Sequence, residues 1–172
     1  MQKDPDAESG QNDSGIVPVA DPAERDAAMR RIASVAASVQ HFVSAGLFGT
    51  YSAAQRRAAK LVEDRKLNRV GDVKIGKTKR TSVFSTRESV ANLAHEYWVT
   101  NETLFAWETV RRAKDVDAVV KPDATILICG VEVDIEVDLD TEGHEQVRAQ
   151  MEKYREAGRY NVWFSTGKTR LE

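Results

Sequence analysis

The sequence is poor in cysteine and lacks the long apolar segments of membrane proteins. No apolar run approaches about 18 residues, and the first residues lack the apolar stretch of a secretory signal peptide. We therefore expect a cytoplasmic protein with no membrane partner. The single cysteine, Cys129, lies in an apolar strand pattern. This pattern predicts a buried thiol, and one cysteine excludes both an internal disulfide and a zinc cluster of cysteines.

Charge is unevenly distributed, although the formal net charge is only −2. Residues 51–90 contain eleven Lys or Arg side chains and four acidic ones. Residues 115–152 contain eleven acidic side chains and two basic ones. The first region therefore suits a polyanion, and the second suits a cation.

The chain begins with a polar segment, residues 1–21, which is rich in Asp, Ser, Gly and Pro and has no apolar period. We interpret it as a disordered tail. Asp21 followed by Pro22 predicts the start of a helix, and apolar residues then recur at helical spacing as far as Phe42. The pattern allows one long helix or two, the second capped by Ser38.

A basic helix followed by a basic hairpin is expected next. Ser52 can cap the helix, and its apolar stripe is formed by Ala54, Ala58, Leu61 and Val62. The sequence then predicts two strands, residues 69–75 and 82–86, joined by a basic loop at residues 76–80. Helices followed by such a hairpin are typical of a winged helix. We therefore assign residues 22–86 to a winged helix-turn-helix DNA-binding domain.

This interpretation predicts how the domain meets double-stranded DNA. The helix would enter the major groove, and the hairpin would contact flanking phosphates. The cationic side chains expected at the interface are Arg56, Arg57, Lys60, Lys74, Lys77, Lys79 and Arg80. The alternative is that the basic helix face is ordinary solvated surface.

The remaining residues, 87–172, are expected to form a small α/β domain with a mixed sheet. A third helical segment is predicted over roughly residues 87–113. Its apolar side chains available for burial are Val90, Leu93, Ala94, Tyr97, Trp98, Leu104, Phe105 and Trp107. His95 lies in the same segment, and a lone histidine among aromatic residues favours a structural role over a ligand role. Residues 124–129 are apolar at nearly every position, as in a strand buried on both faces.

Residues 131–140 alternate between apolar and acidic side chains, so their carboxylates share one face of a strand. A two-residue turn at residues 129–130 would place Asp123 opposite Glu136, whereas a three-residue loop would send Asp123 to the other face. Two like charges so placed destabilise a sheet, and a divalent cation such as Mg²⁺ or Mn²⁺ between them relieves the repulsion. We therefore predict a metal site at this pair. The remaining acids expected on a solvated face are Glu132, Asp134 and Asp140.

Four short segments resemble the PD-(D/E)XK nuclease core in their order: "PDA", "IEVDLDTE", "QMEKY" and "VWFSTGKTR". Behind a winged helix, they are similar to the replication-relaxation family of plasmid replication and mobilisation. The resemblance covers most of the chain. It implies that Asp123 and Glu136 are metal ligands and that Gln150 and Tyr154 line the site.

One position departs from the nuclease pattern. A lysine is expected two residues after the glutamate, and this chain has Asp138 there. Two interpretations stay open. Either Lys153 on the next helix replaces that lysine, or Asp138 helps to bind a second metal ion.

Together these features predict a DNA-binding accessory protein of plasmid or mobile-element replication or transfer, with a nuclease-like domain that binds Mg²⁺ or Mn²⁺. The expected partners are double-stranded DNA, replication or relaxosome proteins, and a second copy of the chain. One alternative is an active metal-dependent DNA endonuclease with the catalytic residues Asp123, Glu136, Gln150, Lys153 and Tyr154. The same features also fit a transcriptional repressor whose acidic domain dimerises, or a module that binds a basic protein.

Overall fold

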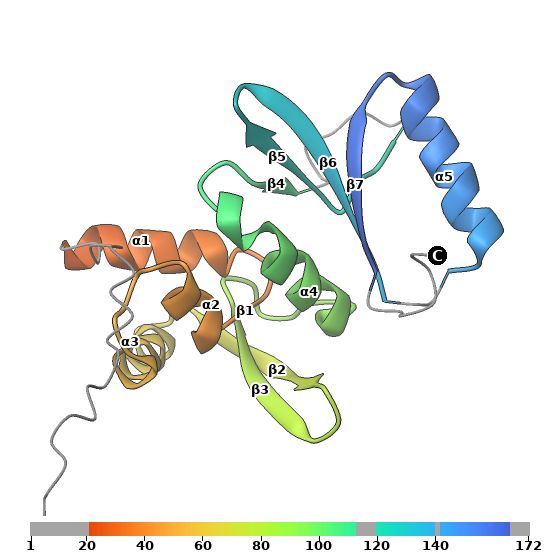
Figure 1. The fold of residues 1–172 in the computed structure, drawn as a ribbon. Coiled ribbons are helices and arrows are strands. Elements are labelled where there is room, and N and C mark those ends of the chain that lie inside the picture. The colour runs from red at the N-terminus through yellow and green to blue at the C-terminus, as the bar shows by residue number, and fades with distance from the viewer. Residues whose placement is uncertain (1–20, 113–119, 140–141, 166–172) are drawn as a thin grey trace, which may run out of the picture.

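The computed structural model describes residues 21–112, 120–139 and 142–165, which form a mixed α+β fold with two small sheets (Figure 1). The first sheet has antiparallel strands in the order β1-β3-β2, and the second has the order β4-β5-β6-β7. The second sheet is mixed, because β6 and β7 are parallel and its other neighbours are antiparallel. The predicted α+β class and mixed C-terminal sheet are confirmed. Within the described ranges, no helix has the length and apolar character needed to cross a bilayer.

The N-terminal half packs helices around the first sheet. Its elements are α1 (Pro22–Ile32), β1 (Ala37–Ser38), α2 (Val39–Ser44), α3 (Tyr51–Glu63), β2 (Asn68–Ile75) and β3 (Lys79–Ser85). The Asp21 carboxylate caps α1, as predicted, by accepting a hydrogen bond of 2.8 Å from the Ala23 N–H. The chain forms two helices rather than one long helix, and Ser38 directly precedes the second.

The cap of α3 is Thr50 rather than the predicted Ser52. The Thr50 hydroxyl accepts a hydrogen bond of 3.2 Å from the Ala53 N–H. Its backbone is extended, as a capping residue requires, whereas Ser52 already lies inside the first helical turn. The apolar stripe is buried as predicted at Ala54, Ala58 and Leu61, with Val62 partly buried.

Strand β2 ends at Ile75 as predicted, whereas β3 begins at Lys79, nearer the tip of the hairpin than the predicted residue 82. Ile75 pairs with Lys79, so the loop holds only residues 76–78. Gly76 has a φ of 64°, a left-handed conformation that glycine adopts without strain. Because the turn is this tight, Lys79 and Arg80 belong to β3 rather than to a basic loop.

Helix α4 (Leu93–Thr103) is shorter than the helix predicted over residues 87–113. Asn92, just before it, has a left-handed φ of 50°, which interrupts any helix that begins earlier. At its other end the chain tightens into a 3₁₀ turn, η1 (Leu104–Ala106). Phe105 lies in this turn and is 68% exposed, so its expected burial is wrong. The tighter turn breaks the helical period on which that expectation depended.

Helix α4 packs against both sheets, as Figure 1 shows. Tyr97 lies in an apolar cluster with Val83 of the first sheet. Val99 lies in a second cluster with Ile135 of the second sheet, and Trp98 packs against both clusters. The two halves of the protein are therefore joined through one helix.

The second sheet is formed by β4 (Arg111–Arg112), β5 (Ala124–Ile128), β6 (Val131–Asp138) and β7 (Tyr160–Ser165), with α5 (His144–Glu156) between β6 and β7. The predicted register of β5 and β6 is confirmed, because Ile128 pairs with Val131 around a two-residue turn. Cys129 lies in that turn with a φ of 50° and is exposed. The predicted buried thiol is therefore wrong, since the turn removes Cys129 from the strand.

Strand β5 is not buried on both faces along its whole length. Leu127 is 46% exposed and Ile128 is 42% exposed. β4 pairs with β5 only at Ala124 and Thr125, so the end of the hairpin extends beyond it.

The two faces of β6 meet different helices. Ile135 and Val137 lie in the apolar cluster that includes Val99 of α4. Glu136 lies on the opposite face, where the Tyr154 hydroxyl of α5 donates a hydrogen bond to it. The acidic face of β6 is therefore a polar layer between the sheet and α5.

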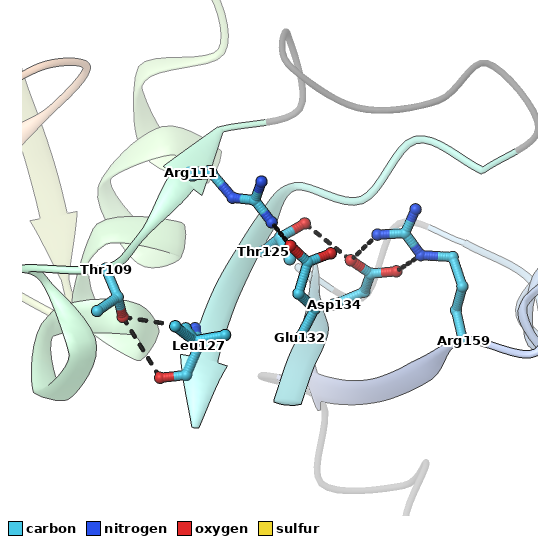
Figure 2. Close-up of polar contacts among 7 residues, drawn as sticks. All are labelled: Thr109, Arg111, Thr125, Leu127, Glu132, Asp134 and Arg159. Atoms are coloured by element: carbon cyan, nitrogen blue, oxygen red, sulfur yellow. Dashed lines mark hydrogen bonds and ion pairs between the residues drawn. The ribbon is translucent and has the colours of Figure 1, made fainter. Parts of the chain in front are cut away.

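Two carboxylates of this face have cationic partners (Figure 2). Asp134 is 1% exposed, accepts a hydrogen bond of 2.8 Å from the Thr125 hydroxyl, and lies 2.6 Å from Arg159 Nε. Glu132 is exposed and forms an ion pair with Arg111. The predicted solvated face is therefore correct for Glu132 and wrong for Asp134. An arginine distant in sequence covers Asp134, a contact that the strand pattern does not contain.

Replacing Arg159 should test the buried ion pair. Arg159→Ala should lower the free energy of unfolding by about 3–5 kcal/mol, because it leaves a buried carboxylate without its cation. The matched control is Arg111→Ala, which removes an exposed pair and should cost about 0–1 kcal/mol. Urea unfolding at neutral pH measures both, and equal losses for the two arginines would contradict the burial of Asp134.

Candidate functional site

A cavity of about 440 Å³ opens between the acidic face of the second sheet and α5. Its lining residues are Val120, Lys121, Asp123, Glu136, Glu142, Gln150, Lys153 and Tyr154. All five side chains predicted as catalytic are therefore brought together, from the start of β5, from β6 and from α5. Their catalytic roles stay a prediction, but their convergence is a property of the structure.

Asp123 precedes β5 and continues the register of the hairpin, in which Ala124 pairs with Ile135. Its Oδ2 accepts a hydrogen bond of 2.8 Å from the Val137 N–H. The carboxylate is thereby held against β6, beside Glu136, and its charge acts on that neighbour. The sequence predicted this placement from the even length of the turn.

Within the cavity, the pKa of Glu136 is strongly raised. Burial raises its pKa to about 8, and the nearby charge of Asp123 acts in the same direction. The hydrogen bond donated by Tyr154 partly opposes this rise. Burial, together with the bond to Glu136, raises the pKa of the Tyr154 hydroxyl. Tyr154 therefore stays protonated at neutral pH and acts as the hydrogen-bond donor to Glu136.

His95 also reaches this site, although the sequence favoured a structural role for it. Its Nε2 lies 3.2 Å from Asp123 Oδ2 and 3.1 Å from the Val137 carbonyl oxygen. The bond to Asp123 raises the pKa of His95. One sequence signal was available: His95 lies four residues before Val99, on the same face of α4 that packs on the second sheet.

The lining of the cavity includes two residues that the sequence did not single out and does not include Asp138. Lys121 and Glu142 line the cavity, and nothing in their sequence context singled them out. Asp138, expected as a metal ligand, is 6% exposed and is not among the lining residues. It shares the face of Glu136 but lies two residues, or about 7 Å, further along β6. Asp140 lies outside the described residues.

The carboxylate pair fits a hard divalent cation. In the part of the chain that the structure describes, no three or more His, Cys, Asp or Glu side chains are grouped so as to hold a metal ion. Mg²⁺ does not need such a group, because it binds through one or two carboxylates and keeps several waters or phosphate oxygens. Asp123 and Glu136 supply two hard oxygen ligands in a partly buried site, where a cation would offset their repulsion.

The predicted DNA-binding residues divide into two groups. Arg57 forms an ion pair with Asp26, with its Nε 2.6 Å from Oδ1, and so joins α3 to α1. Lys60 pairs with Glu63 and Asp64 at 2.9 and 3.3 Å. These intramolecular ion pairs were not expected. Lys60 is exposed despite these pairs, and the other exposed cations of the set are Arg56, Lys74, Lys77, Lys79 and Arg80.

Four of those five exposed cations belong to the β2–β3 hairpin. Lys74 and Arg80 are direct cross-strand partners, so both lie on one face of it. Lys77 lies in the loop and Lys79 at the start of β3. The candidate nucleic-acid surface therefore centres on the hairpin, and Arg56 adds one exposed cation on α3.

Comparison with known proteins identifies no relative: no protein-family model, curated protein or solved structure matches the chain. Function is therefore inferred from the cavity and from the cationic hairpin.

The raised pKa of Glu136 predicts how stability depends on pH in the absence of divalent cations. Folded Glu136 holds its proton up to a pKa of about 8, against an ordinary value of 4.5. Its contribution to stability is therefore full below 4.5 and lost as pH rises through 8. The melting temperature should fall over this window by at least about 2–4 °C, the change expected per kcal/mol for a chain of this size.

Glu136→Gln is the matched variant, because an amide keeps an acceptor for Tyr154 but does not titrate. The variant should lose most of the pH dependence and be more stable than the wild type at pH 8.5. His95 shifts stability in the same sense and is present in both proteins, so the difference between them isolates Glu136. If the melting temperatures of the wild type and Glu136→Gln changed by the same amount between pH 5 and 9, ionisation of Glu136 would have no effect on stability.

Proposed function

We propose that this protein binds double-stranded DNA and that its cavity is a divalent-cation site of the PD-(D/E)XK nuclease type. The observation that carries the proposal is the convergence of five side chains on one cavity: Asp123, Glu136, Gln150, Lys153 and Tyr154. Two carboxylates can hold Mg²⁺ or Mn²⁺, and a nearby lysine suits a phosphate group.

The order of the elements supports both halves of this proposal. The succession α1-β1-α2-α3-β2-β3, with the sheet order β1-β3-β2, is the arrangement expected of a winged helix. The antiparallel pair β5–β6, followed by α5 and the parallel strand β7, is the order expected of a PD-(D/E)XK core. The cations of the hairpin lie where a wing would meet phosphates.

The residues around the cavity can each be given a role. A cation held by Asp123 and Glu136 would supply an activated water and neutralise charge on a scissile phosphate. The Tyr154 hydroxyl orients Glu136, and the Val137 N–H holds Asp123.

Two further side chains of α5 face the position a phosphate would take. Lys153 lines the cavity and brings the positive charge that Asp138 cannot supply. Gln150 lines it as well and can donate a hydrogen bond to a phosphate oxygen. Of the two interpretations left open by the sequence, this favours the lysine on the next helix.

We infer a biological role in plasmid or mobile-element replication or transfer, as a DNA-binding accessory protein, with replication or relaxosome proteins as partners. The resemblance of the segments around Asp123, Glu136 and Tyr154 to the replication-relaxation family supports this role. The presence of Lys153 in the cavity favours a second candidate, an active DNA endonuclease.

Mn²⁺ should raise the melting temperature of the wild-type protein, because a ligand that binds only the folded state stabilises it by about 2.7 kcal/mol at 100 times its Kd. Asp123→Asn should abolish this rise. Asp138→Asn is the matched control and should keep it, since Asp138 does not line the cavity. Absence of any Mn²⁺-dependent shift in the wild type would contradict the metal site.

Nicking of supercoiled plasmid in the presence of Mn²⁺ separates the two candidate functions. Cleavage by the wild type, lost in Asp123→Asn and reduced in Lys153→Ala, would identify an endonuclease. Metal binding without cleavage would identify an accessory protein.

DNA affinity should depend on the hairpin. Charge reversal at Lys77 and Arg80 should weaken duplex binding, and each lost phosphate contact should lower the salt slope by about 1. The control Arg155→Ala removes an exposed cation of α5 that pairs with Glu152, and it should leave affinity unchanged. If Arg155→Ala lowered the affinity and the salt slope as much as charge reversal at Lys77 and Arg80, the hairpin would not be the DNA surface.

A further inference from the structure

A second and larger cavity, of about 790 Å³, lies in the N-terminal half. It is a groove lined by α2, α3, the β2–β3 hairpin and α4, elements that can be located in Figure 1. Its lining residues are Val39, Gln40, Tyr51, Gln55, Ile75, Lys79, Arg80, Thr81, Ser82, Phe84, Tyr97, Trp98 and Asn101. We call it the β3 groove. Its volume is in the range of about 300–1,000 Å³ that is usual for small-molecule sites.

The groove exists because β1 is short. β1 pairs with β3 only at Val83 and Phe84. Among the described residues, no strand pairs with the stretch 79–82 of β3 on that side, and α3 and α4 flank the open edge. The first half of β3 therefore forms part of the groove wall.

The charged side chains that line the groove are all basic. No carboxylate is among its lining residues, whereas Lys79 and Arg80 both are. Its charge therefore suits an anion, in contrast to the cavity of Asp123 and Glu136.

Aromatic rings and carboxamides complete the lining. Tyr51 is 47% exposed, and the ring of Trp98 stands edge-on to Tyr97. Gln55 is an exposed amide that can both donate and accept hydrogen bonds, and Asn101 is an exposed amide whose Nδ2 donates to Glu102 at 3.0 Å. Rings for stacking, amides for base edges and cations for phosphates are together the set that binds an unpaired nucleotide.

A base-paired duplex cannot use such a site fully. Its bases are stacked on one another, so their faces are closed to protein side chains, and only unpaired bases present them. A blunt duplex would therefore meet the cations of the hairpin but not the ring of Tyr51.

We propose that the β3 groove binds unpaired nucleotides of a DNA strand, with a base stacked on Tyr51 or Trp98 and a phosphate near Lys79 or Arg80. This inference rests on the proposed function, because it names the form of DNA that the protein prefers: a duplex that continues into a single strand.

Helix α4 links the groove to the carboxylate pair of the first cavity. It presents Trp98 and Asn101 to the groove and His95 to Asp123. His95 and Trp98 are three residues apart, or about 4.5 Å along the helix axis. A strand held in the groove therefore lies beside the helix that supports the carboxylate pair, at a junction between paired and unpaired DNA.

Fluorescence anisotropy with the full chain tests the proposal. The probes are a blunt duplex, the same duplex with a single-stranded overhang, and a mononucleotide competitor. The overhang duplex should bind about tenfold more tightly than the blunt one, because stacking of one base accounts for such a factor. The mononucleotide should compete poorly, which distinguishes a strand from a free nucleotide.

The variants Tyr51→Ala and Tyr51→Phe separate stacking from folding. Tyr51→Ala should remove the preference for the overhang and leave blunt-duplex affinity unchanged, whereas Tyr51→Phe should keep the preference. Tyr160→Ala, at a tyrosine of β7 that is 70% exposed, is the matched control and should behave as the wild type. 2-Aminopurine in the overhang should lose fluorescence on binding, and less so in Tyr51→Ala.

Two results would overturn the inference while leaving duplex binding intact. They are equal affinities for the blunt and overhang duplexes, and an equal loss for both in Tyr51→Ala. Tight binding of the free mononucleotide would show that the groove serves a small ligand instead. Failure of every DNA probe to bind would overturn the proposed function itself. Melting curves of each variant identify any loss that comes from unfolding.

Discussion

The register of the β5–β6 hairpin is the constraint on which the candidate site depends. A turn of two residues, both with left-handed backbone, sets Ile128 opposite Val131 and so brings Asp123 beside Glu136. A slip of one residue would turn every side chain of one strand to the other face. The carboxylates would then point toward α4, where Val99 packs. The apolar cluster and the polar cavity therefore specify the same register.

Helix α4 transmits this arrangement to the rest of the molecule. Its Tyr97 packs on the first sheet, its Val99 on the second, and its His95 contacts Asp123. A change at either sheet that displaced α4 would therefore also displace His95 from Asp123. The cationic hairpin and the cavity are therefore linked through α4 within one packed unit.

Local patterns predicted the elements well, because helix caps, apolar periods and the alternating strand are short-range signals. The start of α1, the β5–β6 register and the convergence of Asp123 and Glu136 followed from them. Contacts between segments distant in sequence could not be predicted from these local patterns. Asp134 is buried because Arg159 reaches it, and Arg57 of the basic helix is engaged by Asp26. Such partners depend on tertiary packing, which a single sequence does not display.

The acidic strand can now be understood from the partners of its carboxylates. Glu132 and Asp134 each have an arginine, so their charge is compensated within the fold. In the described part of the chain no ion pair joins Glu136 to a basic side chain, and its neighbours include the Tyr154 hydroxyl and the acidic groups of Asp123 and Glu142. Selection for stability alone would favour an arginine partner for Glu136, or an apolar residue at position 136. Retaining a desolvated carboxylate beside another costs stability, as functional sites commonly do. A cation supplied from solution is the partner that would offset this cost.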